Sequence, residues 1–149
     1  MSPPRDQQLQ HYLTLFNSPT ADWSAAEQLI APDYLFSDPF HQLQGLTELR
    51  RYLAYMHRQF DQVRFTPEVV AWQEHHCLLR WRCEASWQRK QLDFRGVSEL
   101  ECDPHGRFRR HTDYWDAAEH FYAELPILGR VLRWTKGRVQ RDFVHAEGR

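Results

Sequence analysis

The stretch that decides the fold is residues 76–102, which read HCLLRWRCEASWQRKQLDFRGVSELEC. From Cys77 to Trp87 every second residue is apolar, and from residue 80 onward the residues between them are charged or polar. The same period of two continues from Leu92 to Cys102. Successive side chains of a strand point to opposite faces, so this pattern predicts two neighbouring strands that bury one face.

The flanking segments extend this pair into an antiparallel meander. Residues 63–72 predict a strand before it and residues 107–115 a strand after it. The last two strands are joined by Asp103-Pro104-His105-Gly106, a sequence typical of a tight turn.

Helices are predicted on both sides of the meander. Apolar residues at helical spacing predict helices over 5–17, 22–31 and 46–60, with a short strand over 34–37. A helical tail over about 117–141 is expected to be interrupted at Pro126 and again at Gly129. The fold class is therefore α+β: a curved antiparallel sheet packed against three N-terminal helices, in one domain spanning 1–149 with its core at about 5–118.

Composition narrows the classes of function. The 149 residues suit a single domain, and a formal net charge of −1 argues against a general nucleic-acid-binding surface. No apolar run approaches the length of a membrane span, and the N-terminus lacks the apolar core of a signal peptide, so we expect a cytoplasmic protein. The three cysteines form no Cys-x-x-Cys pair and are expected to be reduced core thiols.

The segment His111-Thr112-Asp113-Tyr114-Trp115-Asp116 carries the strongest functional signal. On a strand, His111, Asp113 and Trp115 share one face. A carboxylate beside an imidazole is suited to proton transfer, whereas the alternative is a buried structural pair closed by an arginine such as Arg80 or Arg82. The histidines lack a recognised ligand spacing, so no metal site is expected.

This order of elements resembles the nuclear transport factor 2-like superfamily, which includes ketosteroid isomerase and the SnoaL-like polyketide cyclases. The resemblance covers roughly residues 5–118 and implies an α+β cone around an apolar pocket. It also implies a homodimer paired through the outer sheet face. That face would carry Arg80, Arg82, Glu84, Arg95, Glu99 and Glu101.

The resemblance also implies site residues. Gln10-His11-Tyr12-Leu13 resembles the isomerase segment whose tyrosine donates to the substrate oxyanion, and Phe36-Ser37-Asp38-Pro39-Phe40 resembles the segment with the catalytic base. Ser98 falls where the isomerase has a protonated aspartate. In its last strand the chain is closer to SnoaL-like cyclases, which place a catalytic aspartate there, at Asp113.

A purely structural role also stays open for the candidate site residues. Asp38 also fits a turn aspartate that binds nearby backbone amides, and Tyr12 also fits a core tyrosine. Trp115, Trp81 and Phe36 are expected to be packing residues that line the pocket and contact substrate, together with Ser98. The basic tail fits a helix packed on its own domain or on a dimer mate; an anionic membrane surface is the less favoured alternative.

Two functions remain. The first is an enzyme, without a cofactor, that acts by acid/base chemistry on a small, mostly apolar carbonyl or ring compound, with Asp38, Asp113, His111 and Tyr12 as catalytic residues. The second is a non-catalytic ligand-binding or protein-interaction module of the same fold.

Overall fold

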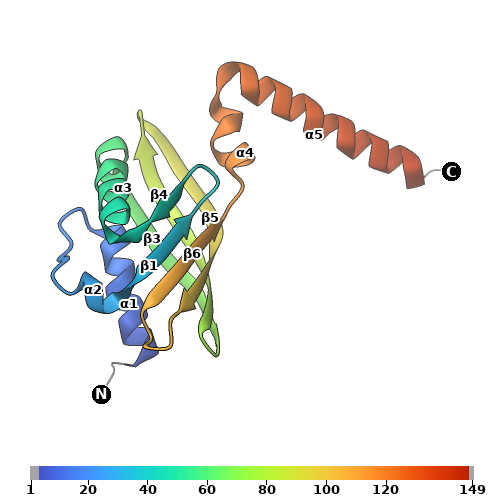
Figure 1. Cartoon of the computed structure of the whole chain (residues 1–149). Coiled ribbons are helices and arrows are strands. Elements are labelled where there is room, and N and C mark those ends of the chain that lie inside the picture. The colour runs from blue at the N-terminus through green and yellow to red at the C-terminus, as the bar shows by residue number, and fades with distance from the viewer. Residues whose placement is uncertain (1–3, 148–149) are drawn as a thin grey trace. The chain divides into compact units, whose positions relative to one another are not determined.

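In the computed structural model, which describes residues 4–147 and the side chains of residues 4–142, the chain divides into two compact units, Met1–Trp115 and Asp116–Arg149. The first unit combines helices with a six-stranded sheet, which confirms the α+β prediction (Figure 1). Its helices are α1 (Arg5–Asn17), α2 (Ala26–Leu29) and α3 (Gly45–Gln59). Its strands are β1 (Ile30–Ser37), β2 (Gln42–Gln44), β3 (Asp61–Gln73), β4 (His76–Trp87), β5 (Lys90–Cys102) and β6 (Phe108–Tyr114).

The sheet has the order β2-β1-β6-β5-β4-β3. Strands β3 to β6 form the predicted antiparallel meander, and Leu79 pairs with Ser98 and Trp81 with Gly96 across β4 and β5. The predicted all-antiparallel sheet has one exception, because β1 runs parallel to β6, with Phe36 opposite His111. This pairing brings the N-terminal part of the chain beside the strand that carries Asp113.

Helices α1 and α3 lie on the same side of the sheet (Figure 1). Their apolar stripes follow the helical period and are buried, as predicted. The buried residues are Leu9, Tyr12, Leu13, Leu15 and Phe16 on α1, and Leu49, Leu53 and Met56 on α3. The core therefore lies between these helices and the inner face of the sheet.

The helix predicted over 22–31 is wrong in extent. It shrinks to the four residues of α2, and β1 begins at Ile30, four residues before the predicted strand. Ile30 is buried and pairs with Phe108 of β6, a partner that local sequence does not reveal. Pro32 has no backbone N–H to donate and sits where the β1–β6 register shifts.

The outer face of the sheet carries the predicted charges, and its arginines pair with carboxylates of other strands. Arg82 bonds Asp93 at 2.6 Å, and Arg80 and Arg95 both approach Glu68, at 3.2 and 3.0 Å. Arg80 and Arg82 are thus engaged with partners other than Asp113.

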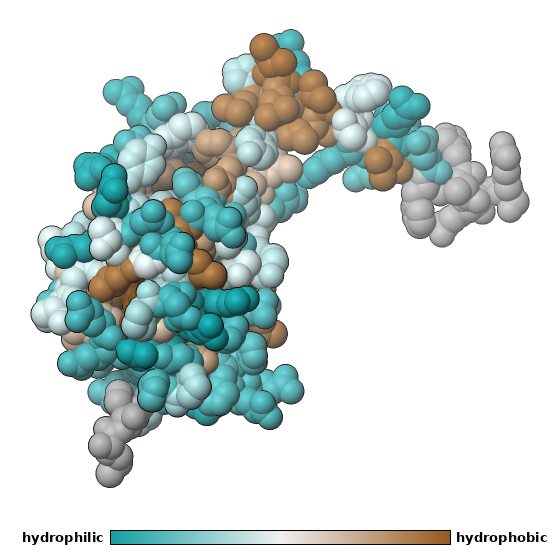
Figure 2. Space-filling model, in the orientation of Figure 1, coloured by the Kyte–Doolittle hydropathy of each residue, from teal (hydrophilic) through white to brown (hydrophobic). Residues whose placement is uncertain are grey.

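The second unit is helical, with α4 (Ala117–His120), the 3-10 turn η1 (Tyr122–Glu124) and α5 (Pro126–Glu147). The predicted break at Pro126 is confirmed as the start of α5, but the break at Gly129 is wrong, and the helix continues past the predicted end at about 141. Several apolar side chains of α5 are exposed, and Figure 2 shows hydrophobic side chains gathered over its first turns. Between residues 4 and 147 no helix is both long and apolar enough to cross a bilayer.

The three cysteines are free thiols, as predicted, and Cys77 and Cys83 are buried. Burial raises the pKa of Cys77 to about 11 and that of Cys83 to about 12. These thiols therefore stay protonated and unreactive near neutral pH.

Candidate functional site

Strand β6 presents His111 and Asp113 to the inner face of the sheet. The His111 side chain is buried, and that of Asp113 is 16% exposed. Tyr114, the next residue along the strand, points to the other face and is exposed. The β5–β6 register places Ser98 directly opposite Asp113. Alternation along two paired strands thus brings an imidazole, a carboxylate and a hydroxyl together, as the sequence predicted for the first two.

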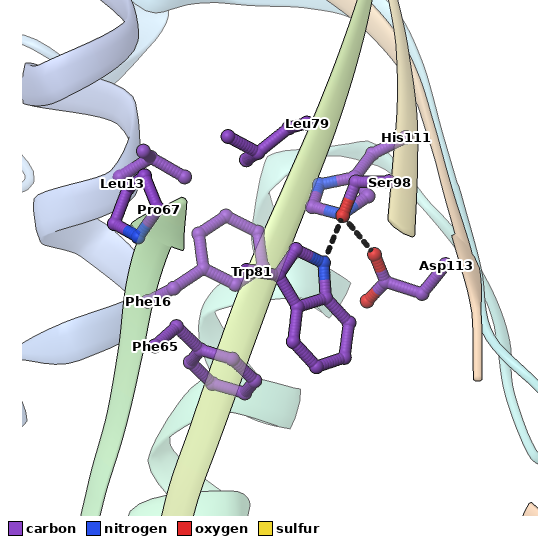
Figure 3. Close-up of a pocket in the computed structure, with 9 residues that line it drawn as sticks. All are labelled: Leu13, Phe16, Phe65, Pro67, Leu79, Trp81, Ser98, His111 and Asp113. Carbon is purple, nitrogen blue, oxygen red and sulfur yellow. Dashed lines mark hydrogen bonds and ion pairs between the residues drawn. The ribbon is translucent and has the colours of Figure 1, made fainter. Parts of the chain in front are cut away.

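These side chains form one hydrogen-bond network around Asp113 (Figure 3). His111 Nε2 lies 2.6 Å from Asp113 Oδ1, and the Ser98 hydroxyl donates to the same oxygen. The Trp81 indole N–H donates to Ser98 Oγ over 2.8 Å. Oδ1 therefore accepts hydrogen bonds from His111 and Ser98, and the Ser98 hydroxyl is itself held in place by Trp81.

The other nitrogen of His111 extends the network to the N-terminal elements. Tyr12 Oη on α1 lies 2.7 Å from His111 Nδ1 and 2.6 Å from Tyr34 Oη on β1. Both tyrosines are fully buried, and burial raises the pKa of each well above its usual value. Both side chains are therefore neutral hydroxyls that can donate.

The direction of each hydrogen bond follows from the chemistry of the donors. An indole N–H only donates, so Ser98 accepts from Trp81 and gives its single hydrogen to Asp113. Asp113 then accepts as a carboxylate, and His111 donates Nε2–H to it while Nδ1 accepts from Tyr12.

Tyr34 sets the far end of this chain, and it donates to Tyr12. If Tyr12 donated to Tyr34 instead, the hydroxyl hydrogen of Tyr34 would need another acceptor, and the described part of the chain offers none. In this arrangement every donor in the network points toward Asp113, with His111 donating through Nε2 and accepting at Nδ1.

The Asp113 side chain lines a small hollow, and its second oxygen, Oδ2, points to the side of the Trp81 ring (Figure 3). The hollow has a volume of about 30 Å³, room for one or two water molecules. Within residues 4–142 no side chain bonds Oδ2, and no buried polar atom lacks a partner, so Oδ2 keeps access to solvent. The lining residues are Leu13, Phe16, Phe65, Pro67, Leu79, Trp81, Ser98, His111 and Asp113.

Asp38 lies apart from this hollow. Its Oδ1 accepts from the backbone N–H groups of Phe40 and His41 at 2.8 and 2.6 Å, and its Oδ2 accepts from the Tyr52 hydroxyl at 2.9 Å. The side chain is 6% exposed. These bonds fasten the turn after β1 to α3.

Two predicted pocket aromatics also lie outside the lining. Phe36 is buried and meets the His111 ring edge-on, with 5.0 Å between centroids. Trp115 packs on Phe94 at 4.9 Å and on Phe40 at 5.6 Å. Of the predicted contact residues, Trp81 and Ser98 line the hollow.

Two residues that shape this site were missed from sequence. Tyr34 shares a strand face with Phe36, and this alternation was the available signal for it. Gly96 makes room for Trp81, because a Cβ at Gly96 would lie 2.4 Å from the indole ring. As for metals, residues 4–142 hold no group of three His, Cys, Asp or Glu side chains placed to bind an ion.

Comparison with known proteins identifies the family. The sequence model of the SnoaL-like domain matches residues 9–111, more than half of the chain. No curated protein matches the chain in sequence.

Solved structures share the fold at low identity. A protein with a ketosteroid isomerase-like fold from Catenulispora acidiphila, in complex with trimethylamine, is 12% identical, with a TM-score of 0.66, covering 76% of this chain and 88% of its own. A candidate polyketide cyclase from Xanthomonas campestris is 16% identical, with a TM-score of 0.66 and coverage of 77% and 92%. TerC co-crystallised with polyporic acid is 15% identical, with a TM-score of 0.63 and coverage of 75% and 93%.

Proposed function

Because the chain belongs to the SnoaL-like domain family, we propose that it is a cofactor-independent isomerase, cyclase or dehydratase. It moves a proton on a small, mostly apolar carbonyl or ring compound. Relatives of the same fold hold small molecules, trimethylamine in one and polyporic acid in another, which supports a small-molecule ligand. We further propose a cytoplasmic homodimer, paired through the outer sheet face.

The observation that carries this proposal is the arrangement around Asp113. Donors from His111 and Ser98 occupy Oδ1, and Oδ2 lies open on the side of the Trp81 ring (Figure 3). A general base needs an accepting atom within hydrogen-bond reach of the proton that it removes. Oδ2 of Asp113 is an open acceptor, whereas three donors and the His41 ring already contact Asp38, so we assign the base to Asp113.

Tyr12 and His111 act through Asp113 in this scheme. The Tyr12 hydroxyl is buried between Tyr34 and His111, and both ring nitrogens of His111 are engaged. We therefore assign both as positioning residues, which hold the carboxylate and fix which oxygen is open.

The test is proton exchange, which needs no knowledge of the product. A panel of small cyclic ketones and β-dicarbonyl compounds is incubated with the protein in D₂O, and loss of the proton next to the carbonyl is followed by ¹H NMR. Asp113→Asn should lower the protein-dependent exchange rate about 100-fold or more. Asp93→Asn, on the outer face, is the matched control and should leave the rate unchanged. Equal rates in Asp113→Asn and the unaltered protein would exclude Asp113 as the base.

The small volume of the hollow favours a second candidate, a non-catalytic binding module. A volume of about 30 Å³ accepts little without movement of its aromatic walls. A ligand that co-purifies with the protein, and stays bound in Asp113→Asn without being turned over, would support this candidate over the enzyme.

A further inference from the structure

The hollow offers one open acceptor and no open side-chain donor. Three lining residues carry hydrogens on nitrogen or oxygen, namely Trp81, Ser98 and His111. Trp81 donates to Ser98, and both Ser98 and His111 donate to Asp113 Oδ1. Oδ2 of the Asp113 carboxylate is the remaining open polar atom of the lining side chains.

The charge balance of the lining points the same way. No lysine or arginine lines the hollow, and Asp113 brings a negative charge. An oxyanion placed beside Oδ2 would meet a like charge in a largely apolar setting, without a donor to hold it. A positive group would be attracted by the Asp113 carboxylate without any rearrangement of the lining.

The aromatic walls add to this preference. Phe16, Phe65 and Trp81 line the hollow, and the Phe65 and Trp81 rings stand at 90° with centroids 5.4 Å apart. Ring faces carry partial negative charge and attract organic cations, indole most strongly. Gly96 leaves the space that the Trp81 indole occupies.

We propose that the hollow selects a small organic cation, an alkylammonium group bound at Asp113 Oδ2 against the Trp81 and Phe65 rings. The inference rests on the proposed function in that it narrows the substrate class of the same site: small carbonyl or ring compounds that also carry an amine nitrogen, or whose reacting state is positively charged. Neutral alcohols of equal size and anionic oxygen groups bind more weakly.

The test uses methylammonium chloride, whose two heavy atoms suit the observed volume, and methanol as its neutral isostere. Binding is followed through the Trp81 indole N–H resonance in ¹H–¹⁵N spectra, assigned with Trp81→Phe, at constant chloride concentration. Methylammonium should bind at least tenfold more tightly than methanol. Dimethylammonium and trimethylammonium then report how far the walls yield.

Asp113→Asn should abolish this preference, and Asp93→Asn should retain it. Equal binding of methanol and methylammonium, or a preference that survives in Asp113→Asn, would overturn the proposal. Binding and exchange fail separately. Methylammonium binding without Asp113-dependent exchange would support the cation site and count against Asp113 as the base. Exchange without methylammonium binding would support the base and overturn the cation site.

Discussion

At the residue scale, the buried hydroxyls of Tyr12 and Tyr34 make unequal contributions to the network. Removing the Tyr34 hydroxyl leaves Tyr12 still donating to His111, so no donor is stranded. Removing the Tyr12 hydroxyl leaves both the Tyr34 O–H and His111 Nδ1 buried without a partner. A group stranded in this way costs roughly 1–3 kcal/mol, whereas a typical net hydrogen bond contributes about 1 kcal/mol.

We therefore expect Tyr12→Phe to lower the free energy of unfolding by roughly 2 kcal/mol more than Tyr34→Phe. Urea denaturation of both variants measures the difference. The ¹⁵N resonances of the His111 ring supply a second readout, since Tyr12→Phe should change the Nδ1 signal and Tyr34→Phe should leave the tautomer as it is. Equal losses of stability would contradict the directions assigned to these hydrogen bonds.

Sequence alone brought together part of this site. Alternation placed His111 and Asp113 on one face, and the family resemblance added Tyr12 and Ser98. It could not separate Asp38 from the hollow, because the partners of Asp38 come from its own turn and from Tyr52 on a helix. Alternation with a period of two shows which face of a strand a side chain occupies. It does not show which residue of another element lies next to that side chain.

At the element scale, Gly129 allows the first turn of α5 to lie close to η1. A Cβ at Gly129 would lie 2.2 Å from the carbonyl oxygen of Ala123 in η1, and Gly137, further along the same helix, has only a flexible arginine at 3.6 Å. Gly129→Ala should therefore shift η1 away from α5. Gly137→Ala should instead favour helix formation by up to about 1 kcal/mol.

Limited proteolysis of the two variants checks this pair, with cleavage between residues 120 and 130 as the readout. We expect faster cleavage in Gly129→Ala and unchanged or slower cleavage in Gly137→Ala. Similar protection in both would show that the close approach at Ala123 does not order this turn.

Long, strongly patterned elements were predicted well, and short ones were not. Strands β4 and β5 carry their own signal in alternating residues. The ends of α2 and β1 depend instead on pairing with β6, and β2 has only three residues. Local propensity is a weak guide where tertiary pairing decides the conformation.

At the scale of the whole molecule, the proposed dimer uses the outer sheet face. Leu78 on that face is 53% exposed. Tyr55 on α3 is 50% exposed, so a substitution at Tyr55 is a matched control for one at Leu78. Leu78→Lys would put a charge into the proposed interface, while Glu99 opposite it keeps the single protomer stable.

Light scattering coupled to gel filtration measures the outcome. The unaltered protein and Tyr55→Lys should elute as dimers, and Leu78→Lys should shift toward the monomer at micromolar concentration. A dimer in all three would place the interface elsewhere.

The parallel pairing of β1 with β6 has a consequence for how the chain folds. Tyr12 and His111 are 99 positions apart, so their contact closes a loop that spans most of the first unit. Such distant contacts are entropically costly to form and slow folding. During synthesis, the helices and the meander hairpins have their partners early, whereas β1 must wait for β6. We therefore expect the β5–β6 hairpin to bring Ser98 and His111 to Asp113 first, and the Tyr12–His111 contact to close the network later.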